Sequence, residues 1–96
     1  MAIVVCGDLR AATLERFWVQ DCAAATQNIL VAITAKGLGG VWCGVHPAEE
    51  RVAKFQELLG LPQHAIPFCL IVAGYPAEQK PRSNRYDAAK VHHNRW

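Results

Sequence analysis

A short basic cluster near the end of the chain is one candidate for ligand binding. It reads Lys80-Pro81-Arg82 and is followed by Arg85. Two cations on either side of a proline could hold a phosphate monoester through charge-assisted hydrogen bonds. Basic residues in loops are more often solvated, so the cluster by itself indicates a solvated loop rather than a phosphate site.

A group of closely spaced glycines is a second candidate: Gly37, Gly39, Gly40 and Gly44. The spacing matches neither the GxGxxG dinucleotide motif nor the GxxxxGK[ST] phosphate loop. Because the group follows a long apolar segment, we interpret it as a helix C-cap and a tight turn. Glycine backbone could still let a ligand approach its N–H groups closely.

The other reactive side chains form no recognisable catalytic arrangement. Ser83 is the single serine and lies in a charged loop. The pair His92-His93 lies in the tail without further metal ligands nearby, so no metal site is predicted. His46 and His64 stand next to turns and are expected to have surface or packing roles. We therefore predict no catalytic side chain.

Four widely spaced cysteines lie within apolar runs: Cys6, Cys22, Cys43 and Cys69. There is no CxxC pattern, and we expect all four to be reduced core residues. The chain has 96 residues and a net charge of +2. This length allows one domain, and this charge argues against nucleic acid or an anionic membrane surface as a partner. The sequence shows neither a membrane-spanning run nor a signal peptide, which predicts a cytoplasmic protein.

Five main segments must position these residues. We expect strands over residues 2–6, 40–45 and 67–73, helices over 19–36 and 48–59, and a short helical turn within 11–16. Gly37 and Gly60 fit left-handed positions at the helix ends. By itself, this order suggests parallel βαβ units, but the sequence does not fix the strand directions.

The two predicted helices differ in their apolar patterns. Helix 19–36 has apolar positions nearly all around its axis, so we expect burial on two sides, against the sheet and against a partner. Helix 48–59 is amphipathic, with an expected apolar stripe of Val52, Phe55, Leu58 and Leu59.

Residues 17–96 carry several motifs in an order that resembles the C-terminal half of the FMN-dependent nitroreductase family. The motifs are a D-x-x-A-A-x-x-N-I-L helix, a G-L-G-x-x-W turn, an E-x-x-V helix ending in L-G-L-P, a G-Y-P strand end, a K-P-R loop and a V-H-x-N-R-W tail. Each motif is weak alone, and together they are specific.

The resemblance implies an α+β fold in which a mixed, largely antiparallel sheet packs on helices, and it implies a homodimer. On strand direction it overrides the parallel interpretation. Residues 1–96 would form a single partial nitroreductase-like domain, with residues 75–96 as an extended arm that embraces the other subunit. The long apolar helix would lie at the dimer interface.

The resemblance also implies a function: hydride transfer from NAD(P)H through FMN to nitro compounds, quinones or similar small-molecule acceptors. Trp42, Cys43, Gly44 and Val45 would pass along the flavin ring, mainly through backbone atoms. Lys80 and Arg82 would hold the FMN phosphate.

One departure from the family concerns the N-terminal half, with its R-x-S-x-R-type motif, which this sequence lacks. We therefore expect a truncated nitroreductase that pairs with a second copy or with the missing N-terminal half. The alternatives are a non-catalytic dimerisation fragment without flavin, or a small Rossmann-like nucleotide binder. An all-parallel sheet would favour the Rossmann-like protein.

Overall fold

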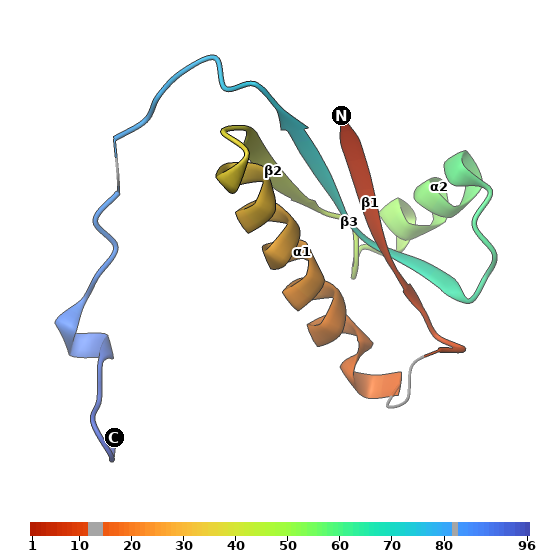
Figure 1. Ribbon diagram of the computed structural model, residues 1–96. Coiled ribbons are helices and arrows are strands. Elements are labelled where there is room, and N and C mark those ends of the chain that lie inside the picture. The colour runs from red at the N-terminus through yellow and green to blue at the C-terminus, as the bar shows by residue number, and fades with distance from the viewer. Residues whose placement is uncertain (12–14, 82) are drawn as a thin grey trace.

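The computed structural model describes residues 1–11, 15–81 and 83–96. Within them, the chain forms three strands, two α-helices and two short 3-10 helices (Figure 1). In chain order these are β1 (Ala2–Asp8), η1 (Glu15–Phe17), α1 (Trp18–Ala35), β2 (Gly39–Gly44), α2 (Glu49–Leu59), β3 (Ala65–Gly74) and η2 (Ala88–Lys90). In this part of the chain, neither α-helix has both the length and the apolar character that crossing a membrane requires.

The three strands form an antiparallel sheet in the order β1-β3-β2. The last strand in the sequence, β3, is therefore the central one. It holds the buried residues Phe68, Cys69, Ile71 and Ala73, whereas Val72 between the last two is exposed. This arrangement confirms the α+β prediction with an antiparallel sheet. It shows that the parallel interpretation, and with it the Rossmann-like alternative, is wrong.

Helix α1 lies along one face of the sheet and buries its inner side chains against β3 (Figure 1). Cys22 and Ile33 of the helix pack with Cys69 and Ile71 of β3. Among the described residues, the core is thus a layer between one helix and the sheet. Helix α2 packs against β3 and makes no contact with α1.

Both helices end at the glycines that the sequence indicated. Gly37 has a φ of 71° and Gly60 a φ of 61°, the left-handed region that glycine adopts without a steric penalty. The N–H of Gly60 donates to the carbonyl of Glu57 at the end of α2. The predicted helix bounds hold to within one residue. The strands predicted over 2–6 and 67–73 extend by up to two residues at an end, and the strand predicted over 40–45 begins and ends one residue earlier. The helical turn expected within 11–16 includes residues 12–14, which lie outside the described residues.

The outer side of α1 is exposed within this chain. Val31 is 58% exposed, although it lies in the middle of an apolar helix. A shallow hollow of about 390 Å³ beside it is lined by Gln27, Leu30, Val31, Thr34 and Ala35. The predicted burial of α1 against the sheet is therefore confirmed, and its burial against a partner stays a prediction.

The expected apolar stripe of α2 is only half correct. Val52 and Phe55 are half-buried, but Leu58 and Leu59 are 78% and 46% exposed. The prediction was wrong for these two leucines because α2 packs mainly against β3, and no described element covers its last turn.

Residues 75–81 and 83–96 are exposed throughout and run away from the sheet and helices (Figure 1). The segment contains one short 3-10 helix, capped where the N–H of Ala89 donates to the Asp87 carboxylate at 3.1 Å. Its contact with a second subunit stays a prediction.

Candidate functional site

The end of β2 at Gly44 is open on the sheet face that carries α1. Side chains alternate along a strand, so residues 40, 42 and 44 point to the same face. At Gly40 an added Cβ would lie 3.1 Å from Leu30 and 3.3 Å from Ile33, both on α1. At Gly44 an added Cβ would meet nothing within 4 Å. Helix α1 therefore closes over the start of β2 and leaves its end uncovered.

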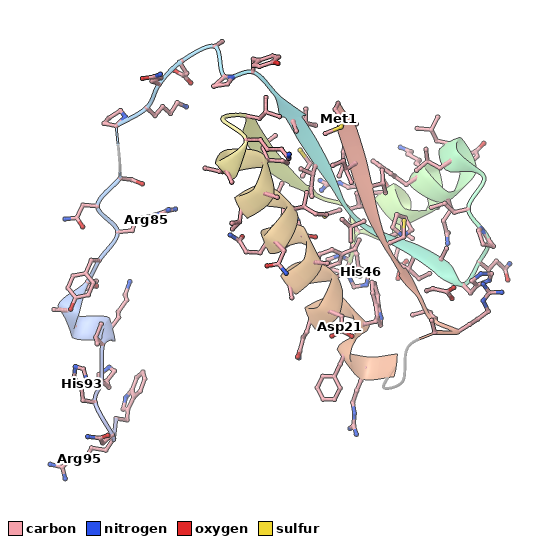
Figure 2. The ribbon with its side chains drawn as sticks, in the orientation of Figure 1. Met1, Asp21, His46, Arg85, His93 and Arg95 are labelled. Atoms are coloured by element: carbon pink, nitrogen blue, oxygen red, sulfur yellow. The ribbon has the colours of Figure 1, made fainter. Side chains whose placement is uncertain are left out.

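A cluster of aromatic rings lies beside this opening. The Trp42 ring lies 5.7 Å from Phe68 with an interplanar angle of 63°, and 37% of Trp42 is exposed. Behind them, Trp18 packs edge-on against His46, with 4.8 Å between ring centroids. Figure 2 shows His46 between the N-terminal part of α1 and the sheet.

The backbone at the end of β2 is tied down at several points. The N–H groups of Val45 and His46 both donate to the carbonyl of Phe68, at 3.1 and 3.0 Å. The Arg51 guanidinium, on α2, donates through Nη1 to the carbonyl of Gly44 at 3.1 Å. The backbone at and after Gly44 is thus bonded to both β3 and α2.

Within residues 1–11, 15–81 and 83–96, strand β2 pairs only with β3 and is thus an edge strand. An edge strand directs alternate N–H and C=O groups away from its partner, where a ligand can use them. A flat ring lying along this edge would find backbone donors and acceptors, one aromatic neighbour and no side chain at Gly44. The opening is therefore suited to a planar heterocycle.

The structure brings together three of the predicted site residues. Trp42, Cys43 and Gly44 are exposed and consecutive on β2. The side chain of Val45 is buried, with 2% exposure, and its N–H is already bonded to Phe68. The side chain of Val45 is therefore not available to a ligand.

The predicted phosphate residues lie apart from this group. Lys80 is exposed and pairs with Glu78 at 2.9 Å. Lys80 lies six residues after Gly74 in the sequence. Gly74 pairs with Gly39, which is at the opposite end of β2 from Gly44. Gly39 and Gly44 are five residue steps apart, about 17 Å at the usual rise per residue of a strand. Arg82 lies outside the described residues.

The cysteines differ from the expectation in one case. Cys22 and Cys69 are buried and Cys6 is half-buried, but Cys43 is exposed. That prediction was wrong because Cys43 lies on an edge strand, on the opposite face from Trp42 and α1. Burial raises the pKa of the Cys6 and Cys22 thiols, and the nearby Cys69 and Asp21, respectively, add to that rise.

Three residues of the site escaped the sequence analysis: Trp18, Arg51 and Phe68. Each lies on a different element, and only the folded chain brings them to the end of β2. The two aromatic residues could have been noticed as large side chains in apolar segments. No local pattern indicated that Arg51 would reach Gly44.

Comparison with known proteins agrees with the fold. The sequence model of the nitroreductase family matches residues 3–75. A protein of Methanothermobacter thermautotrophicus, provisionally named an NADH dehydrogenase/NAD(P)H nitroreductase, is 45% identical over 96 residues, covering 100% of this chain and 50% of that protein. The chain spans about half the length of the curated relatives it matches.

Solved structures give the same result. A crystal structure from Clostridium acetobutylicum, provisionally named an NADH oxidase, superposes with a TM-score of 0.94 at 38% identity, covering 99% of this chain and 58% of that chain. An FMN-dependent nitroreductase from Clostridium difficile R20291 superposes with a TM-score of 0.87 at 27% identity, covering 99% and 57%. With its motifs, its antiparallel sheet and these matches, the chain belongs to the nitroreductase family.

Proposed function

We propose that the chain functions in an FMN-dependent oxidoreductase of nitroreductase type. Such an enzyme reduces nitro compounds, quinones or similar small acceptors with NAD(P)H. The observation that carries the proposal is the open end of β2, where Gly44 faces free space beside the exposed ring of Trp42. The name of the Clostridium difficile relative, an FMN-dependent nitroreductase, supports the same cofactor.

The chain's own residues would bind and orient the flavin, and bound FMN would supply the hydride chemistry. Trp42, Gly44 and the backbone of Cys43 would line the ring, with the backbone of the next residues held by Phe68 and Arg51. Lys80 and Arg82 would hold the phosphate. Because Lys80 follows the opposite end of β2, a site that uses both groups requires the arm to fold back or to come from a second copy.

A second candidate function is a dimerisation fragment that binds no flavin. The exposed outer side of α1, with Val31 and its adjoining hollow, favours this candidate. An apolar helix face of this kind is typical of a protein–protein contact. The two functions make different predictions about flavin and the same prediction about self-association.

Flavin titration of the purified chain tests the first proposal. We expect FMN fluorescence to be quenched on binding, and the bound flavin to be bleached by NADH or NADPH. Gly44→Val should fill the opening and weaken FMN binding at least about tenfold, since β-branched residues suit a strand and Gly44 does not have a left-handed φ. Gly74→Val is the matched control, because Gly74 also faces open space, at the other end of β2.

Equal weakening in both variants would refute the ring site at Gly44. A stable dimer that retains no flavin, measured by size-exclusion chromatography with light scattering, would favour the dimerisation fragment. The absence of flavin from both the chain alone and the chain co-expressed with the remaining half of a longer relative would reject the oxidoreductase.

A further inference from the structure

Trp18 links helix α1 to the end of β2. It is the first residue of α1, and its indole packs edge-on against the ring of Phe68 on β3 and the ring of His46, which follows β2. The centroid distances are 4.8 Å to His46 and 6.2 Å to Phe68, with interplanar angles of 72° and 82°. Edge-to-face pairs at these distances are favourable, so Trp18 restrains both rings.

Strand β1 also lies against the Trp18 indole. Gly7 of β1 is buried, and an added Cβ there would overlap Cε3 of the indole and lie 3.1 Å from Cζ3. The indole therefore rests directly on the β1 backbone, in a space that only glycine leaves free. Trp18 is held between this backbone and the rings of His46 and Phe68.

Phe68 passes this restraint to the end of β2. The register of β1 and β3 shifts at this point: Val5 pairs with Cys69 and Cys6 pairs with Pro67. Phe68 is thus left out of the pairing with β1, as in a β-bulge. Its ring contacts both Trp18 and Trp42, and its carbonyl accepts the N–H groups of the two residues after β2.

We propose that Trp18 is a positioning residue for the ring-binding end of β2. Through Phe68 and His46, it holds residues 42–46 in the geometry that keeps Gly44 open. The effect on FMN rests on the proposed function. The effect on the backbone of residues 45 and 46 does not depend on it.

Amide hydrogen exchange in the ligand-free chain measures the positioning directly. In Trp18→Ala, we expect the amides of Val45 and His46 to exchange about tenfold faster. The reason is that Phe68, whose carbonyl accepts both N–H groups, loses its aromatic contact with Trp18. The amides of Ile3 and Val4 should change less, because they lie in β1, which pairs with β3 and not with β2. Trp18→Phe should restore most of the protection.

The matched control is Phe17→Ala. Phe17 is the neighbouring aromatic residue, is 39% exposed and contacts Arg16 rather than the ring cluster. It should leave the exchange of Val45 and His46 unchanged. In the chain that binds FMN, Trp18→Ala should weaken the flavin affinity about tenfold, and Phe17→Ala should leave it unchanged.

Uniform acceleration of all sheet amides in Trp18→Ala would overturn the proposal, since it would show a merely structural role. Unchanged exchange at Val45 and His46 would overturn it as well. If the wild-type chain binds no FMN, the proposed function fails, and the exchange data still decide the role of Trp18. If Trp18→Ala does not fold, His46→Ala removes the nearest ring contact and should accelerate exchange at the Val45 amide.

Discussion

The hydroxyl of Thr26 on α1 and the thiol of Cys69 on β3 lie 3.2 Å apart, where both residues are 0% exposed. Thr26 Oγ1 also donates to the carbonyl of Cys22 at 2.7 Å. This polar contact lies inside the apolar layer that joins the helix to the sheet. The contact joins one position of α1 to one position of β3.

Thr26→Val should lower the free energy of unfolding by about 1 kcal/mol, because the shape is kept while the buried hydroxyl contact is lost. The measurement is urea denaturation of the wild type, Thr26→Val, Cys69→Ala and the double variant. A coupling of roughly 0.5–1 kcal/mol is expected between the two sites. Strict additivity would mean that the hydroxyl–thiol contact contributes no stability.

Gly7→Ala should lower the free energy of unfolding by about 2 kcal/mol, because the new methyl group would overlap the Trp18 indole. The loss should be visible in the thermal midpoint and as a change in tryptophan emission. Gly74→Ala faces open space and serves as the control, with an expected change within about 0.5 kcal/mol. Similar losses in both variants would argue against the Gly7–Trp18 contact.

Arg51→Met should reduce FMN affinity about fivefold and lower the thermal midpoint by roughly 4–8 °C. The reason is the loss of one exposed hydrogen bond, worth about 1 kcal/mol, to the Gly44 carbonyl at the floor of the opening. Lys54→Met on the same helix is the control for removing a charge. An equal effect of the two substitutions would point to general electrostatics instead of positioning.

Thiol labelling with an aromatic disulfide reagent should modify one cysteine rapidly. Cys43 is exposed, Cys69 is buried, and the pKa values of Cys6 and Cys22 are raised by burial, which keeps these two thiols protonated near neutral pH. Cys43→Ser should remove the fast phase. Persistence of that phase in Cys43→Ser would place the reactive thiol elsewhere.

The local structure of this chain was largely determined by its sequence. Apolar runs marked the three strands, and Gly37 and Gly60 marked the ends of the two helices, since only glycine takes a left-handed conformation there without strain. The motif order indicated the family, and the antiparallel sheet agrees with it. The sequence also predicted that residues 42–44 lie on one strand.

Only the tertiary structure decided what surrounds those elements. Strand direction depends on pairing between distant segments, so the same alternation of strands and helices fitted a parallel sheet equally well. Exposure depends on neighbours, which is why Leu58, Leu59 and Cys43 are exposed despite their apolar surroundings in the sequence. Trp18 and Arg51 reach the end of β2 from separate helices, and no local pattern encodes contacts of such long range.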